Sequence, residues 1–230
     1  HILDNNETKS ISEWTKFDSR ISLGMNLIYD IIDKTEISAT FFVVGWIAEK
    51  YPEIVKEISD RGFEIGSHTH LHQLVYNQNK LTFYNDVEKS IKTIEDITGK
   101  KIRSFRAPGF SITTKNLWAF DALHSLGIEI DSSIFPASRA HGGMKKFIVS
   151  KPSIIKYNGI KLKEFPINTQ NLLGYPFIFS GGGYFRLFPY RLIKKFTDNS
   201  DYIMTYFHPR DFDINQPLIP GLSISRKFKS

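Results

Sequence analysis

The sequence has no cysteine among its 230 residues. This excludes disulfides and thiolate metal sites, so a metal ion would be bound by histidine nitrogens and carboxylate oxygens. Long apolar runs are lacking too, because a stretch such as 39–44 is far shorter than the ~20 residues of a membrane-spanning helix. No signal-peptide pattern opens the chain. We therefore expect no membrane span and a cytoplasmic location.

A concentrated basic region is also missing. The 30 Lys and Arg against 24 Asp and Glu give a net charge of +6, but no basic run is longer than two residues and no nucleic-acid-binding motif occurs. We therefore exclude nucleic acid as a partner. The length and the ordinary composition, 41% hydrophobic and 23% charged, predict a single domain over residues 1–230.

Apolar residues recur at helical spacing in four segments, each followed by a short β-branched or aromatic run. The predicted helices lie around 21–32, 47–58, 87–97 and 113–126, and the strands at 38–44, 63–65, 102–105 and 128–131. Four such units predict an α/β fold with a parallel sheet covered by helices. A hairpin over 154–165 that turns at Asn158–Gly159, a helix at 189–196 and a last strand at 202–207 follow.

Three histidines within five residues follow the second predicted strand, where parallel α/β folds bind their ligands. They are His68, His70 and His72, and this spacing lets imidazoles converge on one cation. The alternative is a polar surface loop that is rich in histidine.

The next strands also end in polar residues. Pro108 holds the preceding residue extended, so Arg106 and the Gly109 N–H are presented rigidly, and Arg106 either binds a carboxylate or forms a structural salt bridge. Asp131 ends the fourth strand, and His208 ends the last. A histidine with a carboxylate in reach is typical of a general acid or base.

These pieces, in this order, resemble the polysaccharide deacetylase family, also called the NodB-homology domain or carbohydrate esterase family four. The His-[Ser/Thr]-x-x-His motif stands as 68–72, Arg-x-Pro as 106–108, and the later Asp and His motifs as Asp131 and His208. Stretches 39–44, 164–166 and 181–186 are family-like as well. The resemblance implies a distorted (β/α)7 barrel of the NodB-homology type and a divalent metal, commonly Zn.

The resemblance also implies a metal-dependent hydrolase that removes an N-acetyl group from an N-acetylated carbohydrate, in a polysaccharide or glycan precursor. His68 and His72 would bind the metal, with His70 as a neighbour. His208 would be the general acid and Asp131 would orient it. Arg106 would hold the catalytic base, and the Gly109 N–H would face the developing oxyanion.

Two departures from the family pattern shape these expectations. The first motif, an Asp-Asp pair on strand one, has no match, so we expect a fragment trimmed at the front and slightly at the end, with the first strand, the base and the third metal ligand upstream of His1. A gap in the barrel wall beside the strand near Ser38, or another segment filling that place, should result. Asp4, the nearest carboxylate, is interpreted as a turn residue. Gly109–Phe110 and 132–135 replace family aromatics, which places the chain in a divergent, surface-polysaccharide branch.

Two other functions stay open. One is a hydrolase of ureides or other amides, similar to allantoinase-like relatives that work without metal. The other is a non-catalytic glycan-binding protein, which only the missing first Asp supports. Several late aromatic residues either stack on sugar rings or fill the core, namely Tyr175, Phe177, Phe179, Tyr184 and Phe185.

Overall fold

The computed structural model describes residues 11–14, 18–137, 142–145, 147, 149–172 and 175–215. The chain divides into two compact units: unit 1 joins His1–Ser38 to Thr169–Ser230, and unit 2 is Ala39–Asn168. Within the described ranges, no helix has the length and apolar character needed to cross a membrane.

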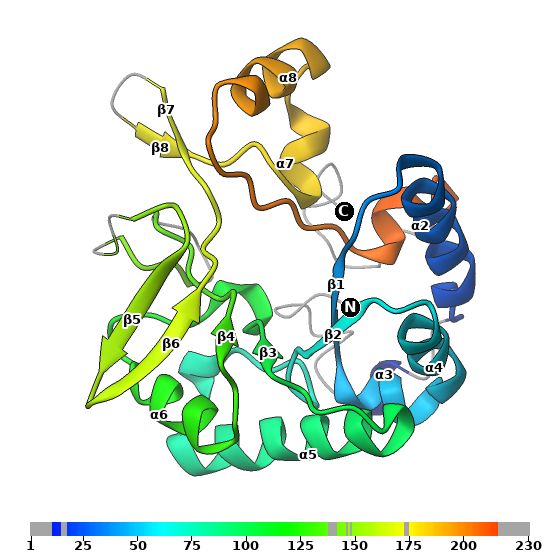
Figure 1. Ribbon diagram of the computed structural model, residues 1–230, viewed down its shortest axis with the longest axis vertical. Coiled ribbons are helices and arrows are strands. Elements are labelled where there is room, and N and C mark those ends of the chain that lie inside the picture. Colours follow the sequence, from blue (N-terminus) through cyan, green and yellow to red (C-terminus); the bar gives the residue numbers. More distant parts are fainter. Residues whose placement is uncertain are drawn as a thin grey trace. The chain divides into compact units, whose positions relative to one another are not determined.

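The described part of unit 2 is built on one six-stranded sheet with the order β1-β2-β3-β4-β6-β5 (Figure 1). The strands are β1 Thr40–Val43, β2 Glu64–Ser67, β3 Ser104–Phe105, β4 Ile130–Asp131, β5 Ser153–Tyr157 and β6 Ile160–Glu164. All neighbours pair in parallel except β5 and β6, which form the predicted hairpin. The mixed α/β fold with a mostly parallel sheet is therefore confirmed. The closed barrel stays a prediction.

β1 is an edge strand of this sheet in the described part of unit 2. The expected gap in a barrel wall beside the strand near Ser38 stays a prediction. The hairpin turn has positive φ at both Asn158 (46°) and Gly159 (80°), as a two-residue turn between antiparallel strands requires.

Helices α3 Gly45–Lys50, α4 Pro52–Asp60, α5 Lys80–Thr98 and α6 Trp118–Ser125 cover the sheet, and α5 packs against the other three (Figure 1). Short 3-10 turns η2 Val75–Asn77 and η3 Pro108–Phe110 follow β2 and β3. The core between α5 and the sheet includes the fully buried Phe83 and Phe105, whose rings meet edge to face.

Two predicted helices begin or break elsewhere. The single helix expected over 47–58 is two helices, because Pro52 has no N–H to continue α3 and instead starts α4. The fourth helix begins at Trp118 rather than near Thr113. There the Asn116 side chain accepts hydrogen bonds from the N–H and hydroxyl of Thr113, which stabilises a turn instead.

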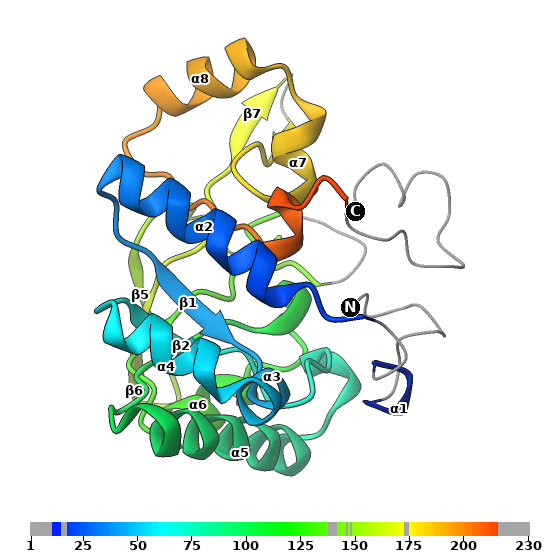
Figure 2. The same cartoon turned by 90° about the vertical axis from the view of Figure 1, so that its right-hand side faces the viewer.

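Unit 1 contains α1 Ile11–Trp14, α2 Ile21–Thr35, the antiparallel strands β7 Gln170–Leu172 and β8 Tyr175–Phe177, α7 Gly182–Leu187, α8 Tyr190–Asp198 and the 3-10 turn η4 Pro209–Phe212. α2 lies against η4 (Figure 2). Arg20 binds both carboxylate oxygens of Asp213, at 2.5 and 2.9 Å, and fixes this contact.

The predictions for the late segment hold in part. α8 confirms the helix at 189–196, whereas the strand expected at 202–207 is wrong, since it is reduced to a single bridge between Gly181 and Tyr206. Phe179 is a core residue, fully buried against Phe196, while Phe185 is 38% exposed. The hairpin β7–β8 was not expected from the sequence.

Candidate active site

The turn after β2, residues 68–72 and called the histidine turn below, brings the two predicted metal ligands together. The ring centroids of His68 and His72 are 4.9 Å apart. His68 Nδ1 lies 2.6 Å from the backbone carbonyl oxygen of Arg106, and a carbonyl accepts only from a protonated nitrogen. The neutral ring therefore carries its lone pair on Nε2, the tautomer in which a histidine binds a metal through Nε2.

Two residues of this turn adopt the left-handed backbone region that L side chains rarely occupy, Thr69 with φ 64° and His72 with φ 56°. The Thr69 hydroxyl accepts from the His72 N–H over 3.0 Å. Such a conformation costs free energy and persists only where surrounding contacts enforce it. Such backbone conformations are typical of active sites and ligand-binding turns.

Helices α3 and α5 supply those contacts. The first amides of α3, those of Gly45 and Trp46, donate to the carbonyls of Thr69 and His70. From α5, Asp86 accepts from the N–H of His70 at 2.9 Å and of Leu71 at 3.1 Å. Burial raises the pKa of the Asp86 carboxyl, and these two N–H groups oppose that rise. The histidine turn is thus held from two helices.

His70 takes a different place from the other two histidines. It is buried, and its Nε2 lies 3.5 Å from the Glu49 carboxylate on α3. Burial, followed by the charge of Lys89, lowers the pKa of His70. A Cβ at Gly45 would lie 2.5 Å from His70 Nδ1, so the ring packs directly against the start of α3. This agrees with its interpretation as a neighbour.

The Arg106 turn follows β3 as the sequence predicts. Ala107 is extended (φ −73°, ψ 136°) before Pro108, and Gly109 has φ 60°. Arg106 Nε donates to the Ser132 carbonyl over 3.1 Å, and its guanidinium carbon lies 4.5 Å from the Phe42 ring centroid. The predicted roles, Arg106 on a carboxylate base and the Gly109 N–H at an oxyanion, stay predictions.

Asp131 ends β4 and is completely buried. Its Oδ1 accepts from the Ser133 hydroxyl over 2.5 Å. A second buried carboxyl, Glu164 at the end of β6, stands opposite it in the strand register. In the sequence, 164–166 is family-like, but Glu164 itself is not predicted as a site residue. The signal that could identify it is a lone carboxylate at the carboxyl end of a strand.

His208 lies in unit 1, where it precedes η4. Its Nδ1 is 3.2 Å from Asp211 Oδ2, and its backbone N–H donates to the same oxygen over 2.8 Å. Burial raises the pKa of the Asp211 carboxyl, but the His208 contacts and the charge of Arg186 outweigh it and leave that pKa below its usual value. Asp211 was missed from the sequence. Asp131 belongs to unit 2, so its pairing with His208 stays a prediction.

Histidine and carboxylate chemistry is consistent with a hard or borderline divalent ion. Within the described ranges, no group of three or more His, Cys, Asp or Glu residues could hold a metal. His68 and His72 therefore fit as two nitrogen ligands of a site whose third protein ligand the described residues do not provide. Asp4, the nearest candidate from the sequence, lies outside them.

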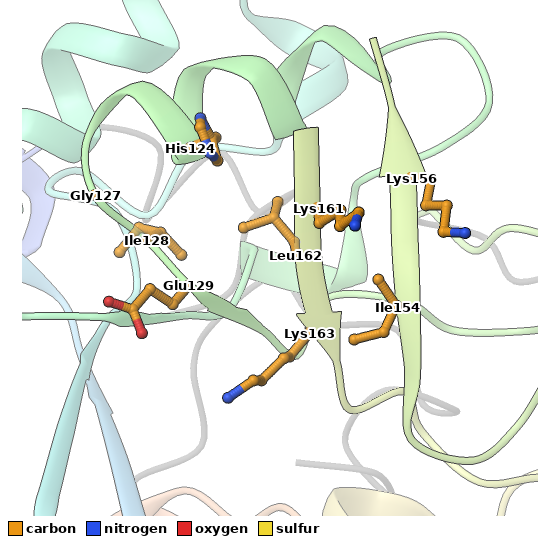
Figure 3. A pocket seen from close by; sticks show the side chains of 9 residues that line it. All are labelled: His124, Gly127, Ile128, Glu129, Ile154, Lys156, Lys161, Leu162 and Lys163. Atoms are coloured by element: carbon orange, nitrogen blue, oxygen red, sulfur yellow. The ribbon is translucent and has the colours of Figure 1, made fainter. Parts of the chain in front are cut away.

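A surface pocket of about 520 Å³ in unit 2 lies beside β5, β6 and the segment that leads into β4 (Figure 3). It is lined by Ile128 before β4, by Leu162 and Lys163 on β6, and by His124 at the end of α6, among others. Its lining includes none of the residues 68–72 and 106–110, so this pocket is separate from the candidate site.

An α/β fold with histidines, an arginine and buried carboxyls at the carboxyl ends of its parallel strands defines a hydrolase-like class of protein. The family model described as polysaccharide deacetylase matches residues 5–129, more than half of the chain. The chain belongs to the polysaccharide deacetylase family. A second model, described as a domain of unknown function (DUF3473), matches residues 132–230.

Relatives of known name are similar over part of the chain. A peptidoglycan-N-acetylglucosamine deacetylase of Bacillus cereus is 28% identical over 46% of this chain and 42% of its own length. The peptidoglycan-N-acetylmuramic acid deacetylase PdaA of Bacillus subtilis is 26% identical over 46% and 40%. A chitooligosaccharide deacetylase of Bradyrhizobium is 24% identical over 59% and 61%. The matches thus span less than two thirds of these relatives.

Two solved structures share the fold. A protein of Mycobacterium smegmatis described as a polysaccharide deacetylase superposes with a TM-score of 0.55 at 23% identity, over 64% of this chain and 46% of its own. The allantoinase Puue superposes with a TM-score of 0.50 at 15% identity, over 63% and 43%. At these identities the likeness concerns the fold alone.

Proposed function

We propose that this protein hydrolyses the N-acetyl group of an N-acetylated sugar in a polysaccharide or glycan precursor, with a divalent metal ion, zinc in the first instance, bound by His68 and His72. Family membership and the names of the relatives support the reaction and the substrate class. The chain's own support is the histidine turn after β2.

The observation that supports metal binding most directly is the hydrogen bond from His68 Nδ1 to the Arg106 carbonyl. It sets the tautomer and holds the ring in one orientation, as carbonyl partners of metal-binding histidines do. A divalent ion at such a site polarises a carbonyl and makes water nucleophilic at neutral pH.

The chain's own residues would divide the remaining work. Gly109 follows Pro108, which has no N–H, so its amide is the first donor of η3, and this amide would stabilise negative charge on a carbonyl oxygen. Arg106 would hold a carboxylate in position. His208, oriented by Asp211 in its own unit, would protonate the departing amine.

The test is acetate release from chitooligosaccharides, with metal content measured on the same protein by elemental analysis. We expect acetate release that a chelator abolishes and added zinc restores. His68→Ala should lose both metal and turnover, whereas His124→Ala, an exposed histidine on α6, should keep both. Ureide hydrolysis without acetate release, or glycan binding without turnover, would overturn the proposal in favour of the other two functions.

A further inference from the structure

The two buried carboxyls at the ends of β4 and β6 form a pair. Asp131 and Glu164 are register partners in a parallel ladder, so their side chains leave the sheet on the same face. Both are 0% exposed. Two carboxylate charges cannot both persist side by side without water, because each charge raises the cost of the other.

Hydrogen bonding accounts for one oxygen of each carboxyl group. Asp131 Oδ1 accepts from the Ser133 hydroxyl, and Glu164 Oε1 accepts from the Ile134 N–H over 3.0 Å. The other two oxygens, Asp131 Oδ2 and Glu164 Oε2, are buried, and no N–H or O–H donor in the described part of the chain reaches them. The carboxyl groups interact with each other instead. Two carboxyl groups that hydrogen-bond to each other require a proton between them, because an ionised carboxylate only accepts.

We propose that Asp131 and Glu164 share one proton, that this proton resides on Glu164 Oε2, and that the neutral acid is a positioning residue for the Arg106–Phe110 turn.

The directions of the surrounding hydrogen bonds assign the proton to Glu164. Ser133 Oγ accepts from the Ala107 N–H over 2.8 Å, and its own proton then points to Asp131. Burial raises the pKa of Asp131, but hydrogen bonds from Glu164, from the Ser133 hydroxyl and from nearby backbone amides oppose that rise and favour its charged form. Burial and the adjacent Asp131 charge raise the pKa of Glu164 well above its usual value, and only the Arg106 charge and the Ile134 N–H oppose this.

The same hydrogen bonds form a directed chain to the candidate site. Glu164 donates to Asp131, and Asp131 accepts from Ser133, which in turn accepts from the N–H of Ala107. Ala107 stands between Arg106 and Pro108. The neutral acid therefore fixes the end of a chain that sets where Arg106 and Gly109 point. This catalytic consequence rests on the proposed function, whereas the location of the proton does not.

The proton can be located by infrared spectroscopy of the whole protein at neutral pH. We expect the carbonyl stretch of a protonated carboxyl group that shifts when glutamate carboxyls carry carbon-13 and that Glu164→Gln removes. Glu129→Gln, an exposed residue just before β4, should leave the band unchanged. A band that shifts only with labelled aspartate, or no band lost in Glu164→Gln, overturns the assignment.

Substitution then tests the positioning role. A glutamine at 164 keeps an acceptor for Ile134 and an N–H donor for Asp131, so Glu164→Gln should turn over close to wild type. Glu164→Leu removes the donor and should lower kcat by roughly tenfold or more, the equivalent of a buried acceptor left unsatisfied. Equal losses in both variants would overturn the positioning role. Should the wild type release no acetate, the proposed function fails while the infrared result still decides the proton.

Discussion

The Nδ1–H of His68 donates a hydrogen bond to the backbone carbonyl oxygen of Arg106, with a distance of 2.6 Å between Nδ1 and the oxygen. This bond joins the end of β2 to the end of β3, two strands that are neighbours in the sheet. One contact therefore sets both the tautomer of a candidate metal ligand and the start of the Arg106 turn. The two predicted motifs act as one structure, which their distance in the sequence does not reveal.

Removal of both candidate ligands should abolish metal binding. The double variant His68→Ala, His72→Ala leaves no imidazole pair in the turn and no thiol to compensate. Elemental analysis should find metal in the wild type and in His124→Ala but not in the double variant. A double variant that keeps stoichiometric metal would show that the ligands lie elsewhere.

Asp86→Ala should weaken metal binding without touching a ligand. Its carboxylate holds the N–H groups of His70 and Leu71, so its loss frees the histidine turn to relax from its left-handed backbone. We expect a roughly 10–100-fold loss of metal affinity, as for other outer partners of metal sites. Competition with a chelator measures it. Glu88→Ala, an α5 residue paired with Lys92, is the matched control, and equal affinity in both variants would contradict the role of Asp86.

The sequence alone predicts those parts of the fold that local pattern determines. The helix marked by Ile21, Met25, Ile28 and Ile32 and the turn at Asn158–Gly159 are correct, because spacing and positive-φ residues act locally. The strand expected at 202–207 is wrong, since a β-branched and aromatic run becomes a strand only where a neighbour pairs with it. Pairing is a property of the whole fold.

The candidate site divides in the same way. The motif residues His68, His72 and Arg106 can be selected by spacing, and the structure brings them together at neighbouring strand ends. Glu164 and Asp86 carry no motif. Their importance comes from register and packing. Glu164 faces Asp131 from another strand, and Asp86 reaches the histidine turn from α5.

Arg106→Lys should not restore the function of Arg106. Lysine keeps the charge but loses the planar group that donates to Ser132 and stacks on Phe42. Stacking of this kind contributes ~0.5–2 kcal/mol, so we expect kcat to fall on the order of tenfold. Arg103→Lys, an exposed residue paired with Glu129, should have wild-type kcat. A fully active Arg106→Lys protein would disprove the geometric role.

The buried carboxyl pair should make stability depend on pH with a definite sign. The pKa of Glu164 is raised in the folded protein, so the folded state keeps a proton that the unfolded state releases above the usual glutamate pKa of 4.5. This stabilisation is fully present below that value and is lost as pH rises toward the folded pKa, with a slope of up to ~1.4 kcal/mol per pH unit. Urea unfolding over a pH series should show the slope in the wild type.

The Glu164→Gln variant is the control for that slope, because glutamine does not titrate. Its free energy of unfolding should decline less as pH rises, so the wild type should fall below the variant toward alkaline pH. Parallel curves for the two proteins would show that the shared proton makes no contribution.

His208 and Asp211 provide the last prediction. If His208 protonates the leaving amine, His208→Ala should lower kcat by ~10²–10⁴-fold with little change in substrate binding. Asp211→Asn keeps the shape of the side chain but removes the charge beside His208 Nδ1 and Arg186, so kcat should fall by less. Asp198→Asn, which breaks an exposed pair with Lys194 on α8, should keep full turnover. Rates of acetate release at saturating substrate compare the three variants.

The depressed pKa of Asp211 also means that its stabilising contribution is present above the ordinary aspartate pKa and is lost as pH falls through the folded value. Acid unfolding of Asp211→Asn should therefore be less steep than that of the wild type. An Asp211→Asn protein with undiminished kcat, beside an inactive Asp131→Asn protein, would assign the orientation of His208 to Asp131 instead.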